Sequence, residues 1–268
     1  MKNTFGFIGT GNMGSALATA AAKVMAPETI FLTNKTQSKA ETLADVLGCH
    51  AVSTAEVASQ CSYIFLGVKP QMMSGLLTEL APVLAARKDR FILVTMAAGL
   101  TMADIQAMAG GSYPVIRIMP NTPVAIGQGV VLYDATADVT ADELTLFCHN
   151  LSEGGLLDRL PEHLIDAGSA VAGCGPAFAD LFVEALADGG VANGLPRAKA
   201  QAYAAQMLKG AAALILESGQ HPGQLKDAVC SPGGSTIAGV RALEQRAFRA
   251  AVMEAVDAAV KRTKELGK

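Results

Sequence analysis

Tryptophan is absent from this 268-residue chain, and aromatic residues of all kinds make up only 5%. Charged residues are sparse as well, at 17%, and the formal net charge is -3. With few rings to stack on bases and no basic stripe, the chain is a poor candidate for a nucleic-acid partner. Hydrophobic residues make up 51%, which excludes a disordered chain and predicts a sizeable core.

Cysteine and histidine are equally limited. The five cysteines are widely spaced without a C-x-x-C pair, and the four histidines include no H-E-x-x-H motif. Neither a disulfide framework nor a metal site is therefore expected. The chain shows no signal peptide, and no apolar run reaches the roughly 18 uncharged residues of a membrane span. We expect a cytoplasmic protein with reduced thiols and no membrane partner.

Up to about residue 155, short apolar runs alternate with segments of helical period. Continuous apolar strands separated by helices predict a parallel sheet covered on both faces. The expected strands are Thr4–Ile8, Ile30–Thr33, Tyr63–Val68, Phe91–Thr95, Val115–Met119 and Val130–Tyr133. The expected helices between them are Met13–Val24, Ser38–Leu47, Met72–Ala85 and Met102–Met108.

From about Pro161 the strand signals stop and alanine-rich helical stretches follow. Ala198–Glu217 has the pattern of one long helix, and Thr236–Leu266 that of another. The chain is therefore expected to divide after Leu160, with an all-helical second domain over residues 161–268. Its helices are long and rich in small residues, so alone they would form a thin bundle. This predicts a homo-oligomer in which a second copy completes the apolar faces.

A glycine fingerprint follows the first expected strand. Gly9, Gly11 and Gly14 form a G-x-G-x-x-G pattern that opens an expected helix, which is the context of a dinucleotide-binding turn. Gly9 permits the tight turn, Gly11 lets a pyrophosphate reach the backbone, and Gly14 allows close packing of helix and strand. Residues 1–160 are therefore expected to form a Rossmann-type dinucleotide-binding domain.

The end of the second strand predicts which dinucleotide is bound. NAD-binding chains usually place a carboxylate there, but residues 33–39 contain none. Lys35, backed by Lys39, is suited to a 2′-phosphate, and Asn34 is able to hydrogen-bond it. We therefore expect NADP(H) to be preferred over NAD(H). The alternative is that both lysines belong to a solvated helix start.

The ends of the expected strands Tyr63–Val68 and Phe91–Thr95 should lie at the same crevice, because ligands of open parallel sheets bind beyond the carboxyl ends of the strands. Lys69 follows the first of these strands and is equally compatible with a surface charge. The small residues Ala97, Ala98 and Gly99 follow the second and leave room for a nicotinamide ring.

A second glycine-rich turn, Cys230–Thr236, stands before the last long helical pattern. Its glycines, Gly233 and Gly234, expose backbone N–H groups at a helix start, where the helix dipole favours an anion such as a carboxylate. Ser235 and Thr236 add hydroxyl groups. The alternative is an ordinary helix N-cap, since serine and threonine are common caps.

The stretch Leu225–Gly239 resembles the signature of the pyrroline-5-carboxylate reductase family. The resemblance runs from residue 6 to about residue 266. The other matching stretches are Gly6–Gly14, Val68–Gln71, Arg117–Pro123, Gly173–Phe178 and His221–Gly223.

The resemblance implies reduction of the C5=N imine of 1-pyrroline-5-carboxylate to L-proline by NAD(P)H, the last step of proline biosynthesis. It implies an interlocked helical dimer, often assembled into larger rings such as decamers. It also implies substrate contacts by Glu162, Ser235 and Thr236, with Thr236 as the catalytic residue that holds the imine nitrogen. The implied cofactor contacts are Ile8, Gly9, Thr10, Gly11, Asn12, Met13, Asn34, Val68, Lys69, Pro70, Met96, Ala97 and Ala98.

Two other functions remain open. A β-hydroxyacid dehydrogenase also joins a Rossmann domain to a helical one, but it typically needs a lysine early in the helical domain, and residues 166–178 contain none. A non-catalytic NADP-binding sensor would need the nucleotide site but no second anion-binding loop.

Overall fold

The computed structural model describes residues 3–266. The chain divides into two compact units, Met1–Cys174 with Ala259–Lys268, and Gly175–Ala258. The boundary expected after Leu160 lies just before helix α7 (Glu162–Ala172), which groups with the first unit by its contacts. The outermost residues of the two expected domains, 1–2 and 267–268, lie outside the described residues.

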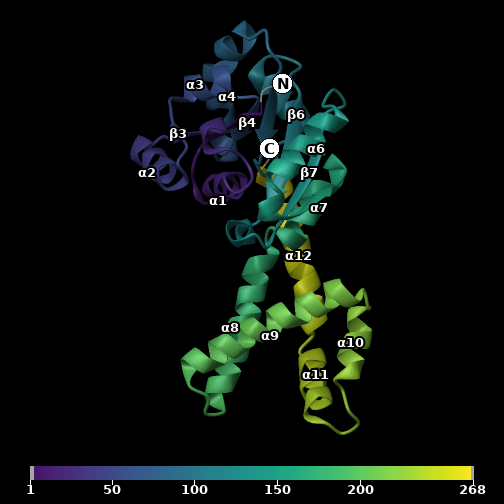
Figure 1. Ribbon diagram of the computed structural model, residues 1–268. Helices are drawn as coiled ribbons and strands as arrows, with labels where there is room; N and C mark the ends of the chain where they lie inside the picture. The colour runs from purple at the N-terminus through teal and green to yellow at the C-terminus, as the bar shows by residue number, and fades with distance from the viewer. Residues whose placement is uncertain (1–2, 267–268) are drawn as a thin grey trace. The chain divides into compact units, whose positions relative to one another are not determined.

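One eight-stranded sheet organises the first unit, in the order β3-β2-β1-β4-β5-β6-β7-β8 (Figure 1). Strands β1 to β6 are parallel, whereas β7 is antiparallel to β6, and β8 is parallel to β7. The bounds are β1 Phe5–Ile8, β2 Ile30–Thr33, β3 His50–Ala51, β4 Tyr63–Leu66, β5 Ile92–Thr95, β6 Val115–Pro120, β7 Gly129–Ala135 and β8 Gly155–Arg159.

The expectation of a parallel sheet is therefore correct for β1 to β6 and wrong for β7. Only residues 121–128 join β6 to β7. A parallel crossover needs a dozen or more residues, so this connection returns the chain antiparallel. The strand bounds expected from the sequence differ from the observed ones by at most two residues.

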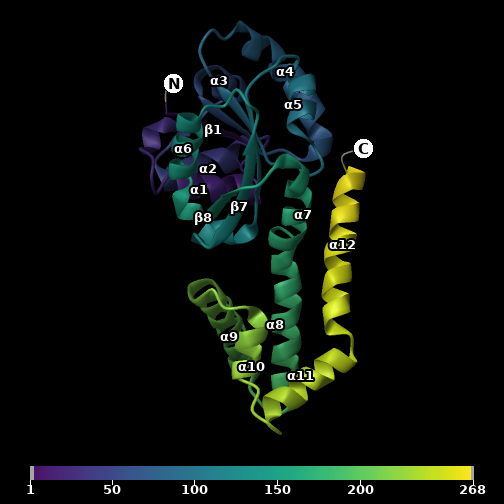
Figure 2. The same cartoon turned by 90° about the vertical axis from the view of Figure 1, so that its right-hand side faces the viewer.

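Helices cover both faces of the sheet, because alternate residues of each strand point to opposite faces. Tyr63 and Phe65 belong to one buried cluster and Ile64 and Leu66 to the other. Buried residues of α1, α2 and α6 join the first cluster, and those of α3, α4 and α5 join the second (Figure 2). The bounds are α1 Asn12–Ala21, α2 Gln37–Leu47, α3 Thr54–Gln60, α4 Pro70–Ala86, α5 Met102–Ala109 and α6 Ala141–Asn150, with short 3-10 helices at Pro27–Thr29, Thr122–Ile126 and Ser152–Gly154.

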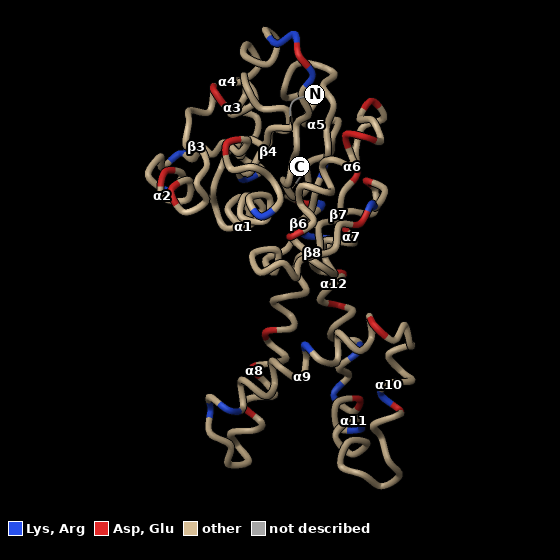
Figure 3. Tube along the Cα trace, viewed as in Figure 1, with Lys and Arg blue, Asp and Glu red and all other residues tan. Residues whose placement is uncertain are grey.

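The second unit is helical throughout its described regular structure, and very little of it is buried. Within residues 175–258 the buried side chains are those of Ala187, Ala200 and Ala204. Helices α8 and α9 carry few charged residues (Figure 3). The bounds are α8 Gly175–Ala192, α9 Arg197–Ser218, α10 Pro222–Ala228, α11 Ser235–Gln245 and α12 Phe248–Leu266, the end of which belongs to the first unit.

Residues 162–192, which include α7 and α8, are long and apolar enough to cross a membrane by length and composition, and 11% of the most apolar window is buried. Core helices of globular proteins pass the same test. Asp180, Glu184 and Asp188 lie along α8. Most of the apolar surface of this stretch is therefore exposed.

The single helix expected over Thr236–Leu266 is wrong. The chain ends α11 at Gln245 and starts α12 at Phe248. Between them Ala247 has a φ of 55°, in the left-handed region. Its N–H donates to the carbonyl oxygen of Glu244 at 3.0 Å, which closes the end of α11. Alanine is the best helix former, so nothing in the local composition signals this break.

Candidate functional site

The turn between β1 and α1 has the geometry that the glycine fingerprint predicts. Gly9 has a φ of 104°, which favours glycine. A Cβ atom on Gly14 would collide with the carbonyl oxygen of Gly9, so glycine is required for the close approach of helix and strand. Nothing described lies within 4 Å of a Cβ atom built on Gly11. The backbone there is open to a ligand, as pyrophosphate binding requires.

Thr10, in the same turn, carries an orphaned polar atom. Its side chain is buried, and its hydroxyl has no hydrogen-bond partner among the described residues. Thr10 lines a cavity of about 380 Å³ between α1 and α2, together with Ser15, Ser38 and Lys39. Buried hydroxyl groups are nearly always paired, so this one fits a site that a ligand completes.

The start of α2 is open in a similar way. Its N-cap, Thr36, makes no side-chain hydrogen bond to the helix. The Lys39 N–H donates to the Thr36 carbonyl oxygen at 3.0 Å, but the N–H groups of Gln37 and Ser38 have no capping side chain, and the positive end of the helix dipole faces outward. Lys35 and Lys39 are exposed on either side of this turn, and Asn34 is half-buried. The arrangement has the charge and the donors that an anionic group needs.

A second cavity of the first unit, of about 310 Å³, lies beyond the carboxyl ends of β4, β5 and β6. It brings together seven residues predicted from the sequence, which come from three separate segments. They are Met13, Val68, Lys69, Pro70, Met96, Ala97 and Ala98. Lys69 lines this cavity and is also exposed, so both interpretations of it given by the sequence stay open.

Three further residues line this cavity that the sequence-based assignment had left out: Gly67, Met119 and Pro120. Met119 and Pro120 are in reach because β6 extends past β5, whose last residue, Thr95, pairs with Arg117. The motif Arg117–Pro123 was visible in the sequence, but only the strand register shows which of its residues reach the cavity.

Glu162 begins α7 in the first unit, and its carboxylate is engaged with backbone. Its Oε1 accepts a hydrogen bond from the Met102 N–H at 2.7 Å and lies 3.6 Å from an Arg117 guanidinium nitrogen. The Glu162 N–H donates to Asp134 at 2.8 Å. Among the predicted substrate residues it is the one that lies in the first unit.

The remaining predicted substrate residues lie in the second unit, at the start of α11. Gly233 has a φ of 69°, and Gly234 is the N-cap, without a side-chain hydrogen bond to the helix. The interpretation of Ser235 or Thr236 as an ordinary N-cap is therefore wrong, because both already lie inside the helix. The first intrahelical bond is donated by the Ala238 N–H to Gly234. The Gly234 N–H donates to the Ser231 carbonyl oxygen at 3.0 Å, whereas Ser235 and Thr236, with their N–H and hydroxyl groups, are exposed.

Within residues 3–266, no group of three or more His, Cys, Asp or Glu side chains is placed to hold a metal ion. All five cysteines are free thiols.

Two family models match the chain, one for each part. Residues 4–99 match the model described as NADP oxidoreductase, coenzyme F420-dependent. Residues 162–266 match the model described as pyrroline-5-carboxylate reductase dimerisation.

Relatives align over the whole chain. The pyrroline-5-carboxylate reductase of Escherichia coli (strain K12) is 38% identical, and the alignment covers 100% of both chains. That of Pisum sativum is 39% identical over 98% of this chain and 96% of the relative.

Solved structures agree with the sequence relationship. The pyrroline carboxylate reductase of Plasmodium falciparum, with NADP bound, has a TM-score of 0.88 at 31% identity and covers 99% of this chain and 98% of its own. The pyrroline-5-carboxylate reductase of Coxiella burnetii has a TM-score of 0.89 at 30% identity, with the same coverage of both chains. A chain with this fold, these two glycine-rich turns and full-length relatives of one kind belongs to the pyrroline-5-carboxylate reductase family.

Proposed function

We propose that this protein reduces the C5=N imine of 1-pyrroline-5-carboxylate to L-proline with NADPH, the last step of proline biosynthesis. The observation that carries the proposal is the full-length relationship to reductases of this name, which covers both glycine-rich turns. The orphaned Thr10 hydroxyl and the open backbone at Gly11 fit a dinucleotide in the first unit. We place the enzyme in the cytoplasm, where five free thiols remain reduced.

The cofactor would be held by four segments of the first unit. The turn Ile8–Met13 offers backbone N–H groups to the pyrophosphate, and Asn34 and Lys35 follow β2 at the adenosine end. Val68–Pro70 and Met96–Ala98 line the second cavity, where alanine side chains leave room for a flat ring. The bound nicotinamide supplies the hydride, and the protein supplies its orientation.

The substrate carries a carboxylate and a cyclic imine, and the start of α11 has donors for both. Uncapped N–H groups beside Gly233 and Gly234 would take the carboxylate, with Ser235 contributing a hydroxyl group. The helix dipole adds about 0.3–2 kcal/mol to such a contact. The Thr236 hydroxyl would hydrogen-bond the imine nitrogen, and Glu162 would contact the substrate from α7.

This chemistry demands positioning more than acid catalysis. A protonated imine is already electrophilic, so hydride addition at C5 leaves an amine and requires no strong protein acid. Holding C5 against the hydride donor is worth several kcal/mol of the barrier. Thr236 is the residue that we assign to this task.

We infer a preference for NADPH over NADH from the end of β2. No carboxylate lies in residues 33–39, so the ribose hydroxyl groups of NAD would lack their usual acceptor. A 2′-phosphate would meet Lys35, Lys39 and the uncapped start of α2. The expected kcat/KM is higher with NADPH, and comparable values with the two cofactors would contradict the preference.

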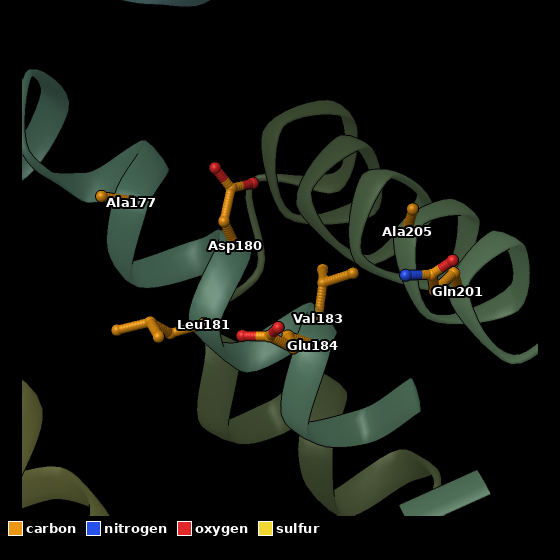
Figure 4. A pocket seen from close by; sticks show the side chains of 7 residues that line it. All are labelled: Ala177, Asp180, Leu181, Val183, Glu184, Gln201 and Ala205. Carbon is orange, nitrogen blue, oxygen red and sulfur yellow. The ribbon is translucent and has the colours of Figure 1, made fainter. Parts of the chain in front are cut away.

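A homodimer, assembled into larger rings such as decamers, is proposed for the second unit. Exposed apolar side chains such as Leu181, Tyr203 and Leu216 lie on α8 and α9, and the dimerisation model covers both helices. A groove of about 500 Å³ lies between these helices (Figure 4). Figure 4 shows Asp180 and Glu184 on one side of it and Gln201 on the other. Sedimentation of a stable 27.5 kDa monomer would contradict this proposal.

A single assay tests the activity. The protein is mixed with NADPH and pyrroline-5-carboxylate, and loss of NADPH absorbance is followed together with proline formation. Thr236→Ala should lose reductase activity yet bind NADPH with unchanged affinity, while Thr236→Ser, which keeps the hydroxyl group, should retain part of the activity. Turnover of a hydroxyacid instead of the imine would favour the dehydrogenase, and NADPH binding without any turnover would favour the sensor.

A further inference from the structure

Arg117 is an unusual residue for its position. It lies within β6, where its neighbours Ile116 and Ile118 are fully buried, and it is itself only 2% exposed. Taking a guanidinium out of water is costly, and arginine does not escape that cost by losing its proton. A charged side chain in a buried strand therefore calls for specific partners.

Its partners lie one helical turn apart on α7. One guanidinium nitrogen donates to Asp166 Oδ1 at 2.6 Å, and the other lies 3.6 Å from Glu162 Oε1. The Arg117 Nε has no partner among the described residues. Arg117 is thus a side chain through which the sheet holds the first two turns of α7.

Glu162 links Arg117 to the loop of residues 96–101, because its carboxylate contacts both Arg117 and the residue that follows the loop. The oxygen that faces Arg117 is also the acceptor for the Met102 N–H, at 2.7 Å. Met102 is the first residue of α5 and ends the loop of residues 96–101. At the other end of this loop the Ala97 N–H donates to the Thr95 hydroxyl at 3.3 Å, and Thr95 pairs with Arg117 across β5 and β6. Both ends of the loop are therefore hydrogen-bonded to residues that neighbour Arg117, namely Glu162 on α7 and Thr95 on β5.

The same loop carries Met96, Ala97 and Ala98, which line the 310 Å³ cavity. We propose that Arg117 is a positioning residue, which orients Glu162 and thereby holds the loop 96–101 in place at the cavity that would take the nicotinamide. The proposal rests on the proposed function. It adds a residue that lies outside the cavity lining and acts through Glu162.

The charges around the contact explain why the guanidinium is needed. Asp134 accepts the Glu162 N–H and pairs with Arg159, so three carboxylates surround the start of α7. Without Arg117, the carboxylates of Glu162 and Asp166 would repel each other. Because the Glu162 side chain is 26% exposed, it has a way to turn toward solvent. The Met102 N–H would then lose its acceptor.

The test compares Arg117→Met and Arg117→Lys with Asp166→Asn as the matched control. Asp166 also pairs with Arg117 but does not touch the loop. Three quantities are measured well below each unfolding temperature: hydrogen exchange of the Met102 amide without cofactor, the dissociation constant for NADPH, and kcat with KM. For Arg117→Met we expect Met102 exchange about tenfold faster, and kcat lower by about tenfold to hundredfold. Arg117→Lys keeps the positive charge but loses the paired donors of the guanidinium, so its Met102 exchange rate and its kcat should lie between those of Arg117→Met and wild type.

In Asp166→Asn we expect both the hydrogen-exchange rate of the Met102 amide and kcat to be close to the wild-type values. A folded Arg117→Met with wild-type exchange and kcat overturns the proposal, and so does an Asp166→Asn variant as impaired as Arg117→Met, since both changes then act merely by loosening α7. If Arg117→Met does not fold, Arg117→Lys decides in the same way. Absence of reductase activity in the wild-type protein would reject the proposed function. The role of Arg117 would still be tested in that case, because Met102 exchange and NADPH affinity are measured without turnover.

Discussion

The backbones of Gly9 and Gly67 approach each other so closely that neither residue has room for a side chain. A Cβ atom on Gly67 would lie 2.7 Å from the carbonyl oxygen of Gly9, and one on Gly9 would lie 2.6 Å from that of Gly67. The Gly67 N–H also donates to Ile8 at 2.8 Å. The fingerprint turn is thus shaped partly by a glycine at the end of β4.

This contact predicts that Gly67→Ala is harmful although its φ does not require glycine. Pushing the two backbones apart should cost about 1–3 kcal/mol of unfolding free energy and weaken NADPH binding, because the fingerprint turn shifts. Urea unfolding and a fluorescence titration with NADPH measure the two effects. Gly75→Ala is the control: it lies in α4 with open space around a Cβ atom, and it should stabilise the protein by about 0.5–1 kcal/mol.

The orphaned Thr10 hydroxyl predicts opposite effects on the free and the bound protein. Thr10→Val removes a buried, unpaired polar atom, so the cofactor-free protein should gain about 1 kcal/mol of unfolding free energy. The rise in melting temperature on adding saturating NADPH should shrink, because the variant lacks a ligand contact. Thr10→Ser should keep most of that rise. An unaltered response to NADPH in Thr10→Val would show that this hydroxyl makes no contact with the cofactor.

Acid should destabilise the protein through Glu143. The hydrogen bond from Arg90 lowers the pKa of Glu143 from its usual range to about 2, and the Glu143 side chain is only 13% exposed. A carboxyl pKa that is depressed on folding stabilises the fold above the unfolded pKa of about 4.3, and this contribution is lost as pH falls from there through about 2. We expect it to be on the order of 2 kcal/mol, after allowing for the partial exposure of Arg90.

Denaturant titrations at pH 7 and pH 3 measure this loss. In Arg90→Gln the free energy of unfolding should be lower at pH 7, and its further drop toward pH 3 should be smaller than in wild type. Arg262→Gln removes an exposed ion pair to Glu265 and should behave as wild type at both pH values. An equal acid-induced loss in wild type and Arg90→Gln would rule out the pair as its source.

Ala247 predicts a stabilising substitution. A left-handed alanine costs roughly 1–2 kcal/mol, which Ala247→Gly relieves, while the greater freedom of glycine in the unfolded chain offsets part of the gain. A net increase of about 0.5 kcal/mol in unfolding free energy is expected. Ala251→Gly, inside α12, should instead lose about 1 kcal/mol. If both substitutions destabilise equally, Ala247 carries no strain.

The strongest sequence signals were those in which several local features agreed. The strand Ile30–Thr33 has the predicted bounds, because a continuous apolar run is framed by polar residues. Helices α3, α6 and α10 were not predicted, although α6 has ten residues with Leu144 and Phe147 buried on one face. All three nevertheless begin with a capping box, such as Ser53 with Glu56 and Thr140 with Glu143. The Ser/Thr-x-x-Glu signature was present in the sequence at α3 and α6 and would have located them, whereas α10 starts from His221, which that signature does not include.

Part of the lining of the cofactor crevice could also be predicted from the sequence. Glycine spacing and strand ends mark backbone that faces a ligand, so Met13, Lys69 and Ala97 were found. Met119 depends on how far β6 extends past β5, which is a matter of register between strands distant in sequence. The link from Arg117 through Glu162 to Met102 joins three separate segments, and no local pattern encodes it.

The reversal of β7 also fixes the point at which the polypeptide leaves the first unit. Helix α7 follows β8 and advances in the direction of β6, from Arg117 beside its first turn to Asn121 beside its last, where the Asn121 amide donates to the Ala172 carbonyl oxygen at 2.9 Å. The exit lies at the edge of the sheet from which Ala97 faces the cavity. Had every strand been parallel, α7 would have run the other way and would have ended at the far edge of the sheet, away from the 310 Å³ cavity.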